Sequence, residues 1–294
     1  MVLLIVLWAS GLIVGFATIQ TSLSGPVHDH WLSALYFSGT NFFTLGYGDI
    51  VAKSGVAKGF AVIEAGIGFG FLAVVIGYLP VLYQLFSDRE KQVIELDARA
   101  GTPPIGANLV CRHIEGQAIE ALDVLLRDWE HWAAQLNESH LSYPMLSYYR
   151  SQQENQSWLM GLAAVMDACA LVMIGIKNVP TFQARMTFAT SRLALVQLCR
   201  VFQIEPAAVA QPRLTADTFT AVVTRLAECE ATFAESGTSE RLAEFTSTYE
   251  PFFSALSAYP LLPLPQWLGS VDDLDNWQDS ARGVTARHCR KMRG

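Results

Sequence analysis

Two long apolar stretches dominate the first part of the chain. Residues 1–23 carry no charged side chain, and a helix of that length would extend about 34 Å, which exceeds the roughly 30 Å core of a bilayer. Residues 59–86 form a second stretch that only Glu64 interrupts with a charge. The pattern therefore predicts an outer membrane helix over 1–23 and an inner membrane helix over 59–86.

A secretory signal peptide is the competing interpretation of residues 1–23. Such a peptide would begin with basic residues and carry a shorter apolar region, whereas Met1 is followed directly by Val-Leu-Leu-Ile. The pattern favours a membrane helix. The abrupt apolar start also suggests that the natural protein begins upstream of Met1.

The segment between the two stretches is aromatic and then rich in glycine. Residues 31–43 are uncharged but too short to cross a bilayer, which predicts a re-entrant helix. Glycine then alternates with other residues over 44–49, and glycine readily adopts the left-handed backbone that would turn successive carbonyls the same way. Irregular backbone at membrane depth is tolerated where it is buried or lines a water-filled path. The pattern indicates a row of carbonyls along such a path.

The sequence Thr-Leu-Gly-Tyr-Gly-Asp over 44–49 resembles the selectivity filter of potassium channels, with Leu45 in place of the usual valine. The order of outer helix, pore helix, filter and inner helix is also similar, so residues 1–86 resemble the two-helix pore domain of bacterial potassium channels. The resemblance implies that K⁺ is coordinated by Thr44, Leu45, Gly46 and Tyr47, with Gly48 completing the filter.

The same resemblance implies roles for residues around the filter. Tyr47 would pack against the pore-helix aromatics Tyr36 and Phe37, and Asp49 would lie at the outer mouth. Thr40 stands where some family members place a glutamate that pairs with this aspartate. Gly68 falls where the family has a hinge glycine in its inner helix.

Three further residues of the inner helix are candidates for gating. Gly77 and Pro80 are residue types that bend or closely pack membrane helices. Glu64 is the ionisable residue of this stretch, and a carboxylate within a membrane is a functional candidate. It either bonds to the back of the pore near the outer interface or takes part in gating and proton sensing.

One filter per chain cannot close a ring of carbonyls, so a pore predicts a homotetramer in a lipid bilayer with potassium ions as its cargo. The filter of the family faces outward. This orientation implies a multi-pass protein of the cell's inner (plasma) membrane with a cytoplasmic C-terminal domain.

Charge is distributed unevenly along the chain. The whole chain is 51% hydrophobic and 16% charged, but the first 86 residues hold only two basic and three acidic side chains. The low charge excludes a disordered chain and a nucleic-acid partner. The composition changes after Phe86, which marks the predicted end of the pore domain.

The rest of the chain shows helical periodicity without strand patterns. A charged linker helix over 87–100 is stopped by the glycine and prolines of 101–104, and a helical domain follows over 101–260. Its predicted helices are 115–138, 155–176, 181–202, 215–235 and 239–258, and an extended or disordered tail covers 261–294. Residues 158–176 could be a third span, but Asp167 at the centre favours a buried helix.

Candidate chemistry in this second part is weak. Cys111, His113 and Glu115 could offer metal ligands, but they alternate as on a strand or loop and have no partner cluster. The polar run over 148–158 indicates a structural network or, as the alternative, a small ligand site. No cofactor and no cytoplasmic ligand can be assigned. Five cysteines without a C-x-x-C pair are typical of reduced thiols.

The sequence therefore predicts an all-α membrane protein: two transmembrane helices with a re-entrant pore helix and filter loop, followed by an all-helical cytoplasmic domain. The predicted function is a potassium-selective channel without enzymatic activity, gated or assembled by its C-terminal domain. Two alternatives stay open: a nonselective cation channel, and a membrane-anchored helical sensor or scaffold whose pore does not conduct.

Overall fold

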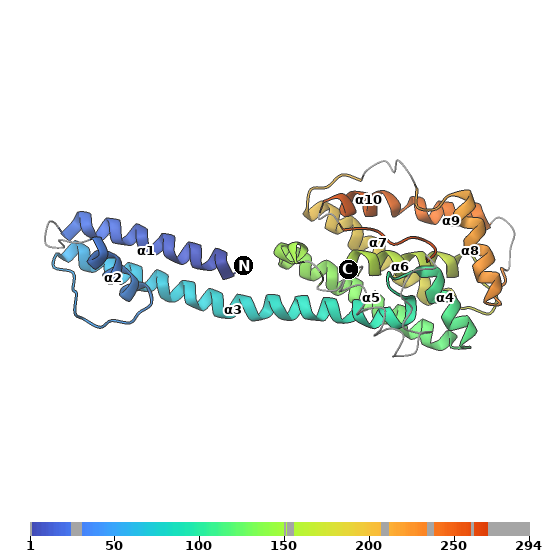
Figure 1. Cartoon of the computed structure of the whole chain (residues 1–294), viewed down its shortest axis with the longest axis horizontal. Coiled ribbons are helices and arrows are strands. Elements are labelled where there is room, and N and C mark those ends of the chain that lie inside the picture. The colour runs from blue at the N-terminus through green and yellow to red at the C-terminus, as the bar shows by residue number, and fades with distance from the viewer. Residues whose placement is uncertain are drawn as a thin grey trace, which may run out of the picture. The chain divides into compact units, whose positions relative to one another are not determined.

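The computed structural model describes residues 2–24, 31–149, 151, 156–206, 212–233, 238–259 and 262–269. These residues form helices joined by turns and irregular segments, with an isolated bridge between Ile176 and Phe233, so the predicted all-α fold is confirmed. The chain divides into two compact units, an N-terminal unit over Met1–Tyr83 and a C-terminal unit over Gln84–Gly294. Figure 1 shows both.

The N-terminal unit contains α1 (Val2–Ser24), α2 (Trp31–Phe42) and the first part of α3 (Gly55–Ala100). Helices α1 and α3 are long and apolar enough to cross a membrane. In both, only 11% of the most apolar window is buried, unlike the core helix of a soluble domain. Their apolar side chains are therefore available to lipid or to other copies of the chain.

Polar contacts join the three helices of this unit. The Gln20 side-chain amide of α1 donates to the Ala57 carbonyl of α3 at 3.1 Å. The Ser38 hydroxyl of α2 lies 2.8 Å from the Ile13 carbonyl of α1. The first bond joins α1 to α3, and the second fixes the short α2 against α1.

The predicted inner helix over 59–86 continues into the predicted linker helix over 87–100, and together they form the single helix α3. It begins four residues earlier than predicted, where the Ser54 hydroxyl accepts a hydrogen bond from the Ala57 amide at 3.1 Å. It ends at Ala100, and the amide of the next residue, Gly101, donates to the Asp97 carbonyl at 2.8 Å. Pro80 lies inside it and removes one backbone donor without ending it.

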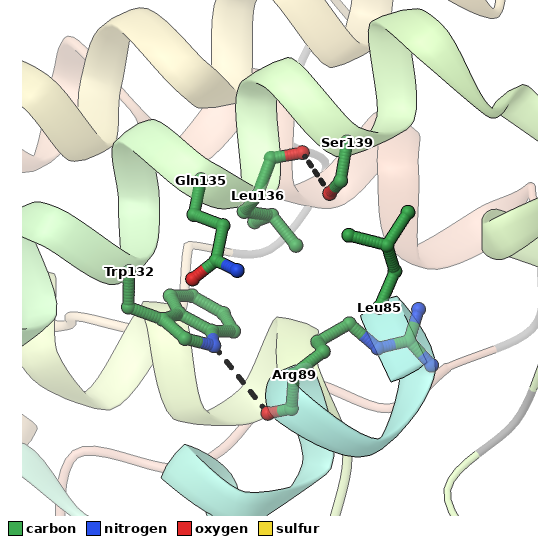
Figure 2. Close-up of a pocket in the computed structure, with 6 residues that line it drawn as sticks. All are labelled: Leu85, Arg89, Trp132, Gln135, Leu136 and Ser139. Carbon is green, nitrogen blue, oxygen red and sulfur yellow. Dashed lines mark hydrogen bonds between the residues drawn. The ribbon is translucent and has the colours of Figure 1, made fainter. Parts of the chain in front are cut away.

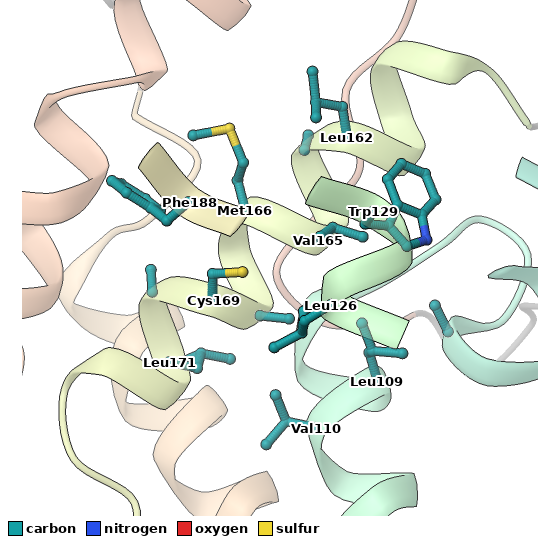
Figure 3. Close-up of a cluster of buried hydrophobic side chains, with 14 of the residues drawn as sticks. Leu109, Val110, Leu126, Trp129, Leu162, Val165, Met166, Cys169, Leu171 and Phe188 are labelled. Carbon is teal, nitrogen blue, oxygen red and sulfur yellow. The ribbon is translucent and has the colours of Figure 1, made fainter. Parts of the chain in front are cut away.

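The C-terminal unit packs its helices around α6 (Trp158–Met173). Every residue of α6 is buried, and Figure 3 shows its side chains meeting those of the neighbouring helices. The span alternative for this segment is therefore wrong, because α6 is the centre of a helical core. The surrounding elements are α4 (Gly106–Glu115), α5 (Ile119–Ser142), η2 (Pro144–Tyr148), α7 (Phe182–Val201), α8 (Ala216–Glu228), α9 (Thr238–Ser247) and α10 (Glu250–Ala258).

Two predicted helices of this unit need correction, and one helix was missed. Helix α4 was not predicted, because its ten residues are too few to establish a helical period. The helix predicted over 215–235 ends at Glu228. The helix predicted over 239–258 is two helices, and Pro251 in the first turn of α10 explains the break because it cannot donate to the preceding turn. The predicted tail lies outside the described residues except for 262–269, which form no helix or strand.

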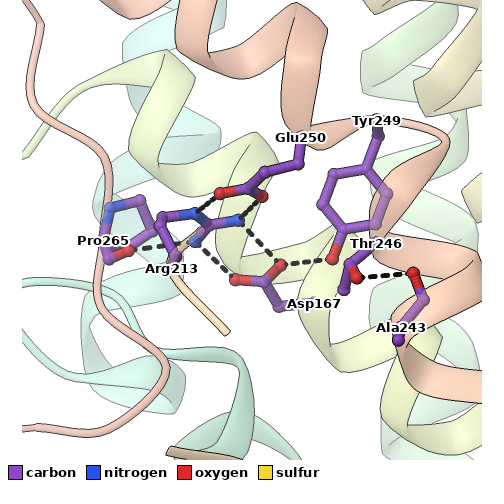
Figure 4. Close-up of polar contacts among 7 residues, drawn as sticks. All are labelled: Asp167, Arg213, Ala243, Thr246, Tyr249, Glu250 and Pro265. Carbon is purple, nitrogen blue, oxygen red and sulfur yellow. Dashed lines mark hydrogen bonds and ion pairs between the residues drawn. The ribbon is translucent and has the colours of Figure 1, made fainter. Parts of the chain in front are cut away.

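A buried ionic network holds the second half of this unit together (Figure 4). Arg213 donates to both oxygens of Asp167 at 2.9 and 3.1 Å and to both oxygens of Glu250 at 2.7 and 2.9 Å. Tyr249 also donates to Asp167, at 2.6 Å. Burial opposes the charge of Arg213, but the two carboxylates outweigh it and raise its pKa. The guanidinium thus compensates the aspartate that interrupts the apolar α6.

We expect Arg213→Met to destabilise the C-terminal unit by about 3–5 kcal/mol, because it leaves two buried carboxylates without a cation. Chemical unfolding of the full chain, followed by tryptophan fluorescence, measures the loss. Arg200→Met, at an exposed position of α7, is the matched control and should change stability by less than about 0.5 kcal/mol. Equal stability of the two variants would contradict the assigned role.

The start of the C-terminal unit is fixed by Arg89 of α3. Its guanidinium donates to the Leu146 carbonyl at 3.0 Å and to the Tyr149 carbonyl at 2.7 Å, and its own carbonyl accepts from the Trp132 indole at 3.4 Å. Figure 2 shows Arg89 beside Trp132 of α5 in a small pocket. Arg89 therefore fixes the part of α3 that belongs to the C-terminal unit against α5 and η2.

His140 lies buried near this contact and gives the unit a pH dependence. Burial, helped by the nearby Arg89 charge, lowers the pKa of His140 to about 4. The unfolded chain, with a histidine pKa of about 6.5, therefore binds the proton more readily than the folded chain. The stability from this group is complete above about pH 6.5 and is lost as the pH falls towards 4, a change of about 3 kcal/mol.

His140→Gln should therefore reduce the loss of stability between about pH 7 and about pH 4.5. Thermal unfolding of wild-type and variant protein at both pH values measures the difference, and Trp158, whose ring centroid lies 5.6 Å from that of His140, is a local fluorophore. His131→Gln changes an exposed histidine of the same helix and should keep the wild-type pH profile. An unchanged profile in His140→Gln would refute the assignment.

Candidate ion-conduction site

The last turn of α2 fixes where the candidate filter begins. Beyond Phe42, the Phe43 amide donates to the Gly39 carbonyl at 3.0 Å and the Thr44 amide to the Asn41 carbonyl at 3.0 Å. The Leu45 amide then donates to the Thr40 carbonyl at 2.8 Å. The first filter residues are thus tied to the C-terminal end of the pore helix. The negative end of the helix dipole lies there and favours a cation.

The filter backbone alternates between two conformations. Thr44, Gly46 and Gly48 have φ values of +55°, +61° and +76°, while Leu45 and Tyr47 stay outside the positive region. A left-handed residue at every second position turns successive carbonyls towards the same side. Thr44 is a non-glycine residue in this conformation, and such strain persists where surrounding contacts impose it.

Two of the aromatic residues predicted to support the filter, Phe37 and Tyr47, differ in burial. Phe37 is buried against Ala52 and Ala57. Tyr47 is 69% exposed in the single chain, so its packing on the pore-helix aromatics remains a prediction.

Asp49 and Thr40 differ in their contacts. The Tyr36 hydroxyl lies within hydrogen-bonding reach of the Asp49 carboxylate. The Thr40 hydroxyl instead donates to the Phe37 carbonyl of its own helix at 2.9 Å. Tyr36 therefore lies close to the aspartate, whose Oδ1 accepts from the Ile50 amide at 3.1 Å, whereas Thr40 supports the first filter residues through its backbone carbonyl.

Gly68 marks the closest approach between α3 and the pore helix. A Cβ added to it would overlap the Phe42 carbonyl oxygen and stand 2.9 Å from the Phe42 Cα. The rings of Phe42 and Phe71 then meet at 5.6 Å beside this point. The structure thus gives Gly68 a packing function at the end of the pore helix, while the hinge function stays a prediction.

The three candidate gating residues have different surroundings. Glu64 is fully buried and hydrogen-bonded to Ser38 of the pore helix. A Cβ added to Gly77 would meet no atom within 4 Å, and Pro80 is exposed within α3. Within one chain, only Glu64 contacts the pore helix among these three. Sequence reasoning missed Ser38, because serine in a helix carries no signal of its tertiary partner.

The candidate metal ligands of the C-terminal unit lie on a helix, not on a strand or loop. On α4, Cys111 and Glu115 point to one side and His113 to nearly the opposite side. His113 Nδ1 contacts the Leu109 carbonyl at 2.7 Å, and burial lowers its pKa. Among the described residues, no group of three or more His, Cys, Asp or Glu side chains could hold a metal ion.

The described part of the polar run over 148–158 forms structural contacts. Gln156 donates to Asp97 at 3.1 Å and to Thr102 at 3.2 Å, and the Ser157 hydroxyl accepts from the Met160 amide at the start of α6. Tyr148 and Tyr259 share a hydrogen bond at 3.1 Å. These contacts favour the network interpretation, with residues 150 and 152–155 outside the described set.

Comparisons with known proteins support an ion-channel function for the N-terminal unit. Residues 2–84 match the model of a protein family described as "Ion channel". This match confirms the resemblance of the N-terminal segment to two-helix pore domains and supports an ion-channel function in a membrane. Because the family model covers under a third of the chain, it says nothing of the C-terminal unit.

Two relatives extend the comparison. An uncharacterized membrane protein of Bacillus subtilis, YdjJ, is 26% identical over 149 residues, which are 50% of this chain and 42% of that protein. Mouse potassium channel subfamily U member 1 is 28% identical over 102 residues, which are 35% of this chain and 8% of that protein. The chain thus spans less than half the length of each relative. No solved structure matches it.

Proposed function

We propose that the chain is one subunit of a tetrameric, potassium-selective channel. The observation that carries this proposal is the alternating backbone of Thr44, Gly46 and Gly48 within a Thr-Leu-Gly-Tyr-Gly-Asp sequence. Carbonyls that face one side can replace the hydration shell of a dehydrated cation. The name of the mouse relative, a potassium channel, agrees with the choice of ion.

The tetramer follows from the number of filter strands. Each chain supplies one strand, and four strands around one axis are needed to surround an ion with carbonyls. The Tyr47 side chain and the apolar faces of α1 and α3 are exposed in the single chain, so surface is available for three further copies and for lipid. Ions would cross passively, by knock-on between adjacent filter sites, with no chemical step.

The C-terminal unit would lie in the cytoplasm and assemble or gate the pore. Helix α3 continues without a break from the N-terminal unit to Ala100, and Arg89 bonds its cytoplasmic part to the carbonyls of Leu146 and Tyr149. A change in this unit can therefore be passed to the pore through a helix. In this orientation the filter lies towards the outer side of the cell's inner membrane.

The test is a reversal-potential measurement on the full chain reconstituted in planar bilayers. With K⁺ on one side and an equal concentration of Na⁺ on the other, a selective pore should reverse far from zero. Reversal near zero would favour the nonselective cation channel. Absence of K⁺ current from tetrameric protein would favour the non-conducting sensor or scaffold.

A further inference from the structure

Three helices of the N-terminal unit meet at the hydroxyl of Ser38. This hydroxyl lies 2.8 Å from the Ile13 carbonyl of α1, and it is also hydrogen-bonded to Oε1 of Glu64 on α3. Ser38 and Glu64 are fully buried. The contact therefore links the pore helix α2 to both long helices through one oxygen atom.

The hydrogen atoms at this junction restrict the protonation state of Glu64. A serine hydroxyl has one hydrogen to donate, and a backbone carbonyl can only accept. If Ser38 donates to Ile13, the hydrogen between Ser38 and Glu64 has to come from the carboxyl group. Both are full two-centre hydrogen bonds only when Glu64 is protonated, because an ionised Glu64 and the Ile13 carbonyl would have to share the single hydroxyl hydrogen.

Among the residues that the structure describes, none places a charge near Glu64 that would compensate an ionised form. Its contacts on α2 are the Ser38 hydroxyl and the Asn41 amide, and α1 carries no ionisable side chain over Val2–Ser24. The ionisable group of α2, Tyr36, faces Asp49, and Lys58 of α3 is exposed. Oε2 of Glu64 and Nδ2 of Asn41 both lack a hydrogen-bond partner. A buried carboxylate without a cation is costly, which favours the neutral acid.

We propose that Glu64 is a proton-sensing positioning residue that holds the pore helix. When its carboxyl releases the proton to water, the Ser38 hydrogen turns to the new carboxylate and the bond to Ile13 is lost. The same helix carries the filter, since the carbonyls of Thr40 and Asn41 accept from the first filter amides. A released pore helix displaces the filter and lowers conduction, so current falls as the pH rises.

The inference rests on the proposed function, and the first experiment compares K⁺ currents of wild-type protein and Glu64→Gln with the same pH on both sides. Wild-type current should fall about tenfold between about pH 5 and about pH 9. Glutamine keeps a neutral donor towards Ser38, so Glu64→Gln should conduct with a flat profile. Lys58→Gln, at an exposed position of the same helix, should keep the wild-type profile.

A second measurement tests the protonation state without current. The infrared difference spectrum between wild-type protein and Glu64→Gln should contain the stretching band of a protonated carboxyl at neutral pH. A missing band, a flat pH profile of the wild-type current, or a pH dependence that survives in Glu64→Gln would overturn this inference but not the proposed function. Wild-type protein that carries no K⁺ current at any pH would instead overturn the proposed function, and the gating role with it.

Discussion

Gly46→Ala should abolish K⁺ current while the tetramer remains intact. Gly46 has a φ of +61°, and a left-handed backbone costs an L-residue with a Cβ about 1–2 kcal/mol. Four subunits together add about 4–8 kcal/mol of backbone strain to one ring of carbonyls. The backbone can relieve this strain by turning a carbonyl away from the conduction path. Single-channel recording of reconstituted protein measures the loss, and cross-linking measures the tetramer.

Two comparisons make this result specific. Gly11→Ala adds the same methyl group to α1 at a point where a Cβ meets no atom within 4 Å, and it should conduct normally. Gly48→Asp, at a φ of +76°, should abolish K⁺ current as Gly46→Ala does. Normal K⁺ current from either filter variant would contradict the assignment of residues 44–49 as the conduction path.

Gly68→Ala should prevent the pore from assembling in a conducting form. The added Cβ would overlap the Phe42 carbonyl oxygen, which is backbone and cannot rotate away as a side chain could. Overpacking of this kind costs about 1–3 kcal/mol per subunit, or forces the pore helix away from α3. The tetrameric fraction by size-exclusion chromatography and the K⁺ flux into liposomes should both fall.

Gly66→Ala and Gly70→Ala are matched controls on the same helix. A Cβ at either position meets no atom within 4 Å of the single chain. Both variants should keep more K⁺ flux than Gly68→Ala. If all three behave alike, close packing at Phe42 does not explain why position 68 is glycine.

The sequence was most informative where chemistry is local. The alternating backbone of residues 44–49 could be predicted from six consecutive residues because it depends on glycine at fixed positions, whereas their function as a filter stays a prediction. The burial of α6 could likewise be predicted, since Asp167 at its centre makes a lone span costly. Helix α4 was missed because ten residues are too few for a clear period. The alternation of Cys111, His113 and Glu115 would place them on one side of a strand, but on a helix His113 points away from the other two.

Contacts between distant segments could not be predicted from the sequence. Ser38 and Glu64 lie 26 residues apart, and nothing in either residue type identifies the other as its partner. Arg213 joins Asp167 and Glu250 across 46 and 37 residues. Such pairs are set by how helices pack, which the apolar pattern of a single helix does not specify.

In the proposed tetramer, the scarcity of buried side chains in the N-terminal unit would make the folding of each subunit depend on its association with the other copies. In the described part of that unit, the apolar cluster around the pore helix contains three buried residues, Phe37, Ala52 and Ala57. A fold with so little interior of its own gains stability from association, so mass action links folding to the amount of protein in the bilayer. Dilution in lipid would then lower the stability of each subunit as well as the number of channels.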